Sequence, residues 1–326
     1  MTLSSSSPGA AASPNSPGRT RRRTLSRVAT AALVAALVGT TAGTAMAKDA
    51  APAPLKDTVR KAAEHRPASH GALKSLKAAA PGSAPIFPVS AVNNSGELYF
   101  YWPDGRGGLD ARDYVTDGWG DFNAASTIDN DKDDFADALY ARTNSGSLIY
   151  STATTSREIP GDWNKYDLVF SPGNLGGAKE SDLLARDRDG VLWLFLAYPD
   201  GTFTGVAHRV GPGWGQYTAI AGQGDLTGDG KTDIVARDRD GVLWLYKGTG
   251  DYNKPFADRT KIGPGWNQFN ALFSTGDVDL DGRSDLIARD KSGALWLYKG
   301  TGSASAPYKT RVKIGNSGWN QFKLLF

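Results

Sequence analysis

Short segments in which apolar and polar residues alternate recur along the chain from residue 85 to residue 326. One unit contains four such segments, at 268–276, 284–290, 294–300 and 310–315. Gly, Asp and Asn bound these segments, and alternation with a period of two between turn residues is typical of β-strands. The Asp-Gly pairs within 186–190 and 237–241 predict tight hairpins between the second and third strands. Each unit is therefore predicted to contain four antiparallel strands.

A tryptophan followed three residues later by an aromatic residue marks each repeat of this pattern. The five copies begin at Trp119, Trp163, Trp214, Trp266 and Trp319, at intervals of 44, 51, 52 and 53 residues. Periods of this size indicate a solenoid, a propeller or an array. Four antiparallel strands per period, with no helix, favour the blade of a β-propeller.

The two ends of the repeat region complete each other. Residues 85–92 and 97–102 match the second and third strands of a unit, but no first strand precedes them. Residues 321–326 match a first strand with nothing after it. Pairing these segments closes the ring and removes an exposed sheet edge. We therefore expect an all-β domain at 85–326, a five-bladed β-propeller of four-stranded antiparallel blades closed by the C-terminal strand. An open array and a strand-swapped dimer are the alternatives.

The first 84 residues have a different composition. A basic stretch at 19–27, an apolar run at 28–38 and small residues at 45–47 predict a signal peptide, 1–47, and a secreted protein. The apolar run is shorter than the roughly 18 residues that a membrane anchor needs. Arg22-Arg23 leaves twin-arginine export open beside the general route. Residues 48–84 are rich in Ala, Pro and Lys, which predicts a flexible linker or pro-segment, with a short helix at 55–66.

Charge and cysteine content narrow the function further. Residues 85–326 carry 25 basic and 31 acidic residues, a net −6, although the whole chain is formally +3 because the leader is basic. An acidic domain does not suit nucleic acid, whose phosphates attract positive surfaces. The chain has no cysteine, which excludes disulfides and thiolate metal sites. An exported domain without disulfides needs another source of stability.

Three acidic loops between first and second strands offer that source. The loops at 129–137, 225–233 and 277–285 place oxygen-bearing side chains at positions 1, 3, 5 and 9. Gly230 and Gly282 stand at position 6, where a sharp turn is needed, and Asp134 takes that place in the first loop. Hard oxygen ligands that converge from one turn favour Ca²⁺. A solvated Asp-Gly turn is the alternative for any one of these loops.

The predicted calcium ligands follow from those positions. The side-chain ligands are Asp129, Asp131, Asp133 and Asp137; Asp225, Thr227, Asp229 and Asp233; and Asp277, Asp279, Asp281 and Asp285. The backbone carbonyls at position 7 are those of Phe135, Lys231 and Arg283. The corresponding loop 174–182 keeps only Asn174 and Asp182, and we expect no ion there.

Ligand binding is expected on the opposite face, where the hairpins and the tryptophan segments meet. Aromatic rings with nearby amide and charged groups are typical of a shallow site for a polar ligand. The candidate residues are Trp119, Trp163, Trp214, Trp266, Trp319, Arg186, Arg237, Arg289, Asn267 and Asn320. The alternative is that the five tryptophans pack blades together and that the arginines pair with neighbouring aspartates. The second set, Trp193, Trp244 and Trp296, alternates with leucine and is expected in the core.

An enzymatic function is the least favoured interpretation. Residues 85–326 contain one histidine, His208, and no cysteine, so a nucleophilic centre would depend on His208 alone. Most carboxylates lie at repeated positions, which suits repeated binding better than a single asymmetric catalytic pair. We expect a protein that is not an enzyme.

The acidic loops and the strands that follow them resemble a known repeat. The loop with "DIVARDRDGVLWLY" or "DLIARDKSGALWLY" after it resembles the FG-GAP or VCBS repeat of integrin-type propellers, although no FG-GAP tripeptide is present. "GWNQFNALF" and "GWNQFKLLF" also resemble blades of tachylectin-type five-bladed lectins. The resemblance implies a calcium-stabilised propeller with glycan sites between neighbouring blades. The expected partner is a glycan or cell-wall polymer. The alternative is a protein-binding adhesion module for a cell-surface protein, and a polysaccharide-acting enzyme comes third. Neither nucleic acid nor, after signal removal, a membrane is expected as a partner.

Overall fold

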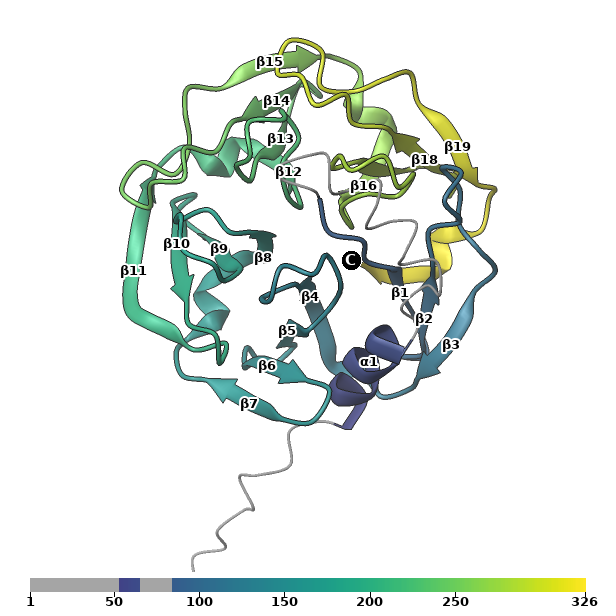
Figure 1. Cartoon of the computed structure of the whole chain (residues 1–326), viewed down its shortest axis with the longest axis vertical. Helices are drawn as coiled ribbons and strands as arrows, with labels where there is room; N and C mark the ends of the chain where they lie inside the picture. Colours follow the sequence, from purple (N-terminus) through teal and green to yellow (C-terminus); the bar gives the residue numbers. More distant parts are fainter. Residues whose placement is uncertain (1–52, 65–83) are drawn as a thin grey trace, which may run out of the picture. The chain divides into compact units, whose positions relative to one another are not determined.

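Five four-stranded antiparallel sheets form a ring in the computed structural model, which describes residues 53–64 and 84–326 (Figure 1). The predicted fold class, a closed five-bladed β-propeller, is confirmed. The predicted signal peptide, 1–47, lies outside the described residues. No helix among the described residues is long and apolar enough to cross a membrane.

The strands are distributed over the blades in chain order, except for the last strand. Blade 1 contains β20 (Phe322–Leu325), β1 (Val89–Asn93), β2 (Leu98–Tyr101) and β3 (Asp113–Thr116). Blade 2 contains β4 (Phe122–Ile128), β5 (Ala138–Thr143), β6 (Leu148–Thr152) and β7 (Ser156–Ile159). Blade 3 contains β8 (Tyr166–Gly173), β9 (Asp182–Asp187), β10 (Leu192–Ala197) and β11 (Phe203–Gly211). Blade 4 contains β12 (Tyr217–Ala221), β13 (Ile234–Asp238), β14 (Leu243–Tyr246) and β15 (Thr260–Gly263). Blade 5 contains β16 (Phe269–Phe273), β17 (Leu286–Asp290), β18 (Leu295–Tyr298) and β19 (Val312–Gly315).

The ring closes in blade 1, where the C-terminal strand pairs with the first strand of the propeller. β20 runs antiparallel to β1, with Ala91 opposite Leu325 and Val92 opposite Leu324. The amide of Ser90 donates to the carbonyl of Phe326 at 2.8 Å, and the Phe326 amide donates back to Ser90 at 3.1 Å. This pairing satisfies backbone groups that an unpaired edge strand would leave exposed.

The hairpins between second and third strands are built by an aspartate and a glycine. In blade 3, the amide of Gly190 donates to the carbonyl of Asp187, and Gly190 has a φ of 75°, which a residue with a Cβ adopts only at a cost. The Asp187 carboxylate accepts the Val191 amide at 2.8 Å and the indole N–H of Trp193 at 2.8 Å. Trp244 and Trp296 bond Asp238 and Asp290 in the same way. These three tryptophans are half-buried beside the blade cores, so their expected place inside the core is only partly right.

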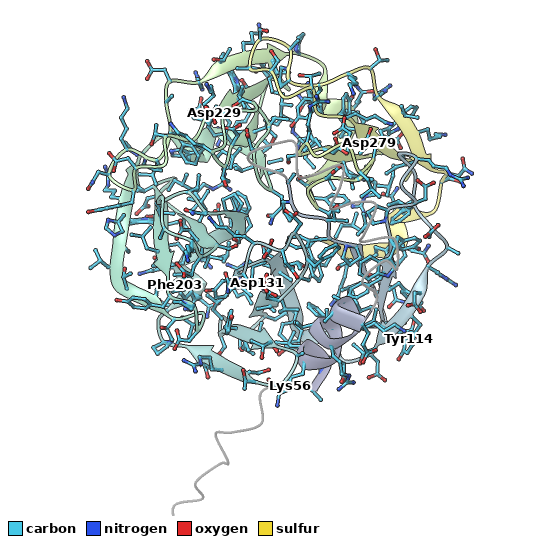
Figure 2. The ribbon with its side chains drawn as sticks, in the orientation of Figure 1. Lys56, Tyr114, Asp131, Phe203, Asp229 and Asp279 are labelled. Atoms are coloured by element: carbon cyan, nitrogen blue, oxygen red, sulfur yellow. The ribbon has the colours of Figure 1, made fainter. Side chains whose placement is uncertain are left out.

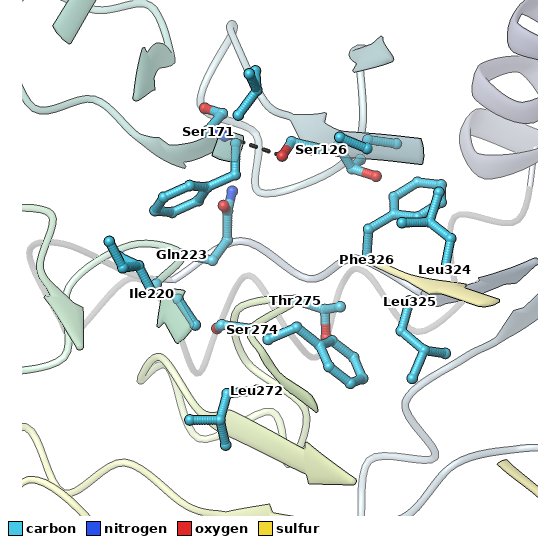
Figure 3. Close-up of a pocket in the computed structure, with 18 of the residues that line it drawn as sticks. Ser126, Ser171, Ile220, Gln223, Leu272, Ser274, Thr275, Leu324, Leu325 and Phe326 are labelled. Carbon is cyan, nitrogen blue, oxygen red and sulfur yellow. Dashed lines mark hydrogen bonds between the residues drawn. The ribbon is translucent and has the colours of Figure 1, made fainter. Parts of the chain in front are cut away.

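The first strands of the five blades surround a central cavity of about 210 Å³. Figure 3 shows Ser126, Ser171, Gln223, Thr275 and Phe326 around it, one from each blade or from the loop next to its first strand. No charged side chain from residues 53–64 or 84–326 lines this cavity. Residues 84–87 cross one end of it, because the amides of Ile86 and Phe87 donate to the carbonyls of Asp134 and Thr275.

One helix, α1 (Ala53–Glu64), precedes the propeller and packs against it. Leu55, Thr58, Val59 and Ala62 are its buried residues, and they recur every three or four residues on one face. Within the segment expected to be a flexible linker, this stretch is therefore ordered and docked. Its amphipathic pattern, diluted by alanine, explains the difference, because composition alone does not show that an apolar face has a partner. Residues 65–83 lie outside the described part of the chain.

Candidate metal-binding loops

The three acidic loops connect the first and second strands of blades 2, 4 and 5. Figure 2 labels one residue of each, Asp131, Asp229 and Asp279, and the common strand order of the blades puts the three loops on one face of the ring. Position 6 has a positive φ in every loop, 76° at Asp134, 80° at Gly230 and 87° at Gly282. The sequence therefore predicted the turn correctly, including an aspartate that adopts the left-handed region.

Backbone amides hold the first and last carboxylates of each loop. In the loop 225–233, Asp225 accepts the amides of Gly228 and Gly230, each at 2.7 Å. Asp233 accepts the amides of Leu226 and Thr227 at 3.1 and 2.9 Å through one oxygen. Its other oxygen accepts the amide of Gly248, in the loop between third and fourth strands, at 2.8 Å. The turn is therefore organised by hydrogen bonds before any ion is considered.

In two of the loops, three carboxylates converge on one point. Oxygens of Asp129, Asp131 and Asp137 lie within 4.8 Å of one another, and so do oxygens of Asp277, Asp279 and Asp285. Asp277 and Asp285 are almost completely buried, at 0% and 2% exposed. Since carboxylates this close repel one another when all are ionised, the arrangement favours an oxygen-binding cation.

Burial raises the pKa of these carboxylates, which favours their protonated form when no cation is bound. Desolvation raises the pKa of Asp285 to about 8, although the Gly300 amide opposes the shift. Desolvation likewise raises the pKa of Asp277 to about 7 and that of Asp129 to about 7, against amides that lower it. Asp233 follows the same pattern, with a pKa of about 6. A bound cation would take the place of the proton that each of these groups otherwise favours.

The third loop combines a carboxylate cluster with a buried oxygen that has no hydrogen-bond partner. Asp279 Oδ1 is buried and has no hydrogen-bond partner, while Asp279 Oδ2 pairs with Lys299 Nζ at 2.9 Å. A buried carboxylate oxygen without a partner is costly. Asp277, Asp279 and Asp285 therefore present an acceptor that the protein itself leaves unused.

The second loop differs from the other two. Its position 3 is Thr227 instead of aspartate, and Asp229 pairs with Lys247 at 3.2 Å. Among the described residues, its carboxylates do not form a cluster of three. In the third loop, Asp281 pairs with Arg283 and Lys309. Ligation of an ion by any of the predicted residues, among them Asp133, Asp229, Asp281 and the carbonyls of Phe135, Lys231 and Arg283, stays a prediction.

The fourth loop, 174–182, keeps part of this geometry without the other carboxylates of the acidic loops. Asp182 accepts the amides of Leu175 and Gly176 at 2.9 and 2.7 Å, as the last aspartate does in the acidic loops. Asn174 accepts the amide of Gly177 at 2.9 Å. The last aspartate therefore has a structural role in all four loops, and an ion would add to it in three.

The five repeated tryptophans lie between blades. Their exposed fractions are 0% for Trp119, 3% for Trp163, 6% for Trp214, 7% for Trp266 and 8% for Trp319. Each begins a short 3-10 helix that leads into the first strand of a blade. Rings with so little exposed surface cannot stack on a sugar in this conformation, and their burial agrees with the packing alternative.

The three predicted arginines bind the backbone of the following blade. The Arg237 Nη1 group donates to the carbonyls of Trp266 and Phe269 at 3.1 and 2.6 Å. Arg186 and Arg289 make the corresponding pairs of bonds to the next blade. Arg186 also pairs with Asp167 at 2.8 Å, an aspartate but not the hairpin neighbour expected from the sequence. Each of these guanidinium groups is therefore hydrogen-bonded across a junction between two blades.

The predicted asparagines join the same junctions. Asn267 donates to the carbonyl of Arg239 at 3.1 Å, and Asn320 donates to that of Lys291 at 3.0 Å. Each therefore ties the start of one blade to the hairpin of the blade before it. The face chosen from the sequence for ligand binding consists largely of these inter-blade contacts.

A polar recess lies instead on the face of the acidic loops, and sequence reasoning missed it. It has a volume of about 400 Å³ and is bounded by three loops of blades 2 to 4 and by Pro85. Asn174, Lys179 and Lys231 contribute amide and ammonium groups to its wall. Tyr252, 40% exposed, is not part of this wall but lies beside one of its loops, since a Cβ added to Gly176 of the loop 174–182 would come within 3.6 Å of the Tyr252 Cβ. No single loop predicts this hollow, because it forms only where three blades meet.

His208 contacts an exposed aromatic side chain. It lies on β11, and its ring meets that of Tyr252 edge-on, with centroids 4.8 Å apart. His208 lies on the outer strand of blade 3, and Tyr252 lies in the loop between the third and fourth strands of blade 4. The contact therefore joins these two blades.

Comparison with known proteins supports the repeat and adds little else. Residues 225–288 match the family model of the FG-GAP-like repeat, a span that runs from the second acidic loop through the third. No curated protein is similar enough to count as a match. A solved structure of BBS1N in complex with ARL6DN, soaked with mercury, is 12% identical over 72% of this chain and 67% of that chain, with a TM-score of 0.35. Human WBSCR16 is 11% identical over 71% and 66%, with a TM-score of 0.36.

Proposed function

Starting from a five-bladed β-propeller that carries an FG-GAP-like repeat, we propose that the protein is an exported binding module stabilised by calcium. One observation carries the metal part of this proposal. Asp277, Asp279 and Asp285 bring carboxylate oxygens within 4.8 Å of one another, and one oxygen of Asp279 is buried without a partner. Oxygen-only ligands on a tight loop favour Ca²⁺ over softer metals.

The ligand that the proposal assigns is a glycan or cell-wall polymer, bound at the polar recess. Hydroxyl groups of a sugar would bond Asn174, Lys179 and Lys231, while the exposed ring of Tyr252 offers a flat surface for an apolar sugar face. This site lies on the face of the acidic loops, opposite the face expected from the sequence. The recess is chosen because the five tryptophans on the face expected from the sequence are buried and leave no ring for a sugar to contact.

Binding to a glycan array would test the ligand class. The full chain should retain specific glycans in 1 mM calcium, and Tyr252→Ala and Lys179→Ala should each reduce that signal at least tenfold. Tyr114→Ala is the matched control, because Tyr114 is an exposed tyrosine as well, at 50% against 40% for Tyr252, but lies on β3 of blade 1.

Two results would contradict this assignment. Equal loss of signal in the Tyr114 variant would show that the recess is not the site. Absence of any glycan signal, together with capture of one defined cell-surface protein, would favour an adhesion module.

A further inference from the structure

Four of the five junctions between blades share two stabilising contacts. The first is an arginine that donates to backbone carbonyls of the next blade; these arginines are Arg142, Arg186, Arg237 and Arg289. The second is a pair of aromatic rings in which the repeated tryptophan meets a residue of the third strand. The pairs are Trp163 with Phe195, Trp214 with Tyr246, Trp266 with Tyr298, and Trp319 with Tyr101, with centroids 4.4 to 5.0 Å apart.

The junction between blades 1 and 2 lacks both contacts. The hairpin register places Val92 where the other blades have the arginine, because Asn93 opens the blade 1 hairpin as Asp290 opens that of blade 5. In blade 2, Ser151 stands where the other third strands have an aromatic ring, and Ile149 stands where three of them have tryptophan. Trp119, the tryptophan of this junction, therefore has no third-strand ring to pack against.

Helix α1 occupies this junction. It contacts β3 of blade 1 and β5 and β6 of blade 2 (Figure 1). Leu55 and Val59 belong to the same apolar cluster as Trp119 and Ile149, and their exposed fractions are 0% and 2%. Trp119 is completely buried, and its ring partners from the blades, Phe122 and Phe326, do not belong to a third strand.

Polar contacts fix the register of the helix in the junction. The indole N–H of Trp119 donates to Thr58 Oγ1 at 3.2 Å, a buried bond between residues 61 positions apart. Lys61 pairs with Asp113 on β3 at 3.1 Å. The opposite side of the helix carries exposed charged groups such as Arg60 and Glu64. The helix therefore matches this groove in both apolar and polar positions.

We propose that the junction between blades 1 and 2 is a helix-binding groove, and that its occupant is the chain's own segment 53–64. The helix fills the place that an aromatic pair takes in the other four junctions, while Lys323 of β20 donates to the carbonyl of Gly120 at 2.7 Å where those junctions use an arginine. It is thus an obligatory part of the folded domain, and a mature secreted form retains it. This inference does not depend on calcium or on the identity of the ligand.

Charge placed in the helix tests its role in the full chain. Val59→Asp would bury a carboxylate in the apolar groove and should lower Tm by roughly 5 °C or more. Ala53→Asp introduces the same charge into the same helix at an exposed position, and should change Tm by less than about 1 °C. Equal Tm values for the two variants would overturn the proposal.

Because the chain has no native cysteine, a cysteine pair tests docking without relying on destabilisation. Lys61→Cys with Asp113→Cys, bridged by a short bifunctional maleimide that replaces the length of the Lys61 side chain, should give an intramolecular crosslink and raise Tm. Arg60→Cys with Asp113→Cys is the control, since Arg60 lies on the exposed side of the helix. Equal crosslinking in both pairs, or a mature secreted protein that begins after Glu64, would contradict the proposal.

Discussion

At the scale of single residues, the repeated charged and aromatic side chains hold neighbouring blades together. Arg237 is only 8% exposed and uses one nitrogen for two carbonyls of the next blade. Hydrogen bonds from a charged donor contribute more than neutral ones. The same contact recurs at Arg186 and Arg289, so the repetition of these residues in the sequence reflects repetition of the junction.

Replacing Arg237 with methionine should therefore destabilise the domain strongly. The two carbonyls would lose their donor while staying buried, and we expect the free energy of unfolding to fall by about 2–3 kcal/mol. Urea denaturation followed by circular dichroism measures this loss. Arg239→Met is the control: Arg239 makes one exposed bond to the carbonyl of Gly215, and its loss should cost less than about 0.5 kcal/mol. Similar losses of unfolding free energy in both variants would argue against this role of Arg237 at the junction.

The hairpin aspartates should make the stability of the fold sensitive to acid. Desolvation raises the pKa of Asp290, but hydrogen bonds from Ser292, Trp296 and Ala294 outweigh it and hold the pKa at about 2. Since this is below the ordinary aspartate value of 3.8, the ionised group stabilises the fold above pH 4, and the contribution is lost as pH falls toward 2. Asp290→Asn should flatten the decrease of Tm between pH 4 and pH 2. An unchanged slope in a thermal scan would count against this assignment.

At the scale of elements, the acidic loops are linked to their neighbours as well as to their own strands. Ser181 Oγ donates to the carbonyl of Asp129 in the loop of the preceding blade, at 2.9 Å. Ser284 Oγ donates likewise to the carbonyl of Gln223 at 2.6 Å. An ion that fixes one loop would therefore also fix the loop beside it.

Two equivalent aspartates separate the structural role of a loop from its metal role. Asp285 and Asp182 hold the same position and accept similar amides, but only Asp285 belongs to a cluster of carboxylates. Asp285→Asn should reduce the calcium-induced rise in Tm by about one third. Asp182→Asn should lower Tm by a similar amount with and without calcium, leaving the rise itself intact. Isothermal titration calorimetry should count one fewer site in the first variant only; loss of a site in the second would contradict the distinction.

At the scale of the whole molecule, calcium bound as proposed would take the place that disulfides hold in many exported domains. Extracellular calcium sites have Kd values of about 0.1 to 1 mM. At ~1 mM calcium and a Kd of ~0.1 mM, each site contributes about 1.4 kcal/mol, or roughly 4 kcal/mol for three independent sites. This is a large share of a typical net stability of about 5–15 kcal/mol.

Removal of calcium should thus lower the melting temperature measurably. For a domain of this size, a loss of ~4 kcal/mol corresponds to roughly 8–16 °C in Tm. Differential scanning calorimetry in EDTA, then in excess calcium, measures the shift and its reversal. Magnesium at the same concentration should restore less, because it demands near-ideal octahedral geometry. A Tm that does not change when chelator is added would contradict the proposed stabilisation by calcium.

The sequence by itself determined the blades, the loop turns and the closure of the ring. These depend on local rules: strand alternation, a glycine or aspartate at a positive φ, and matching strand fragments at the two ends. It did not determine which repeated side chains face solvent, because burial of Trp119 or Arg237 is decided by the neighbouring blade. It also could not place α1, since Thr58 and Trp119 meet only after the ring has formed. The helix pattern specified an apolar face. Only the tertiary structure shows what this face packs against, which is the one junction that lacks the arginine and the third-strand aromatic ring.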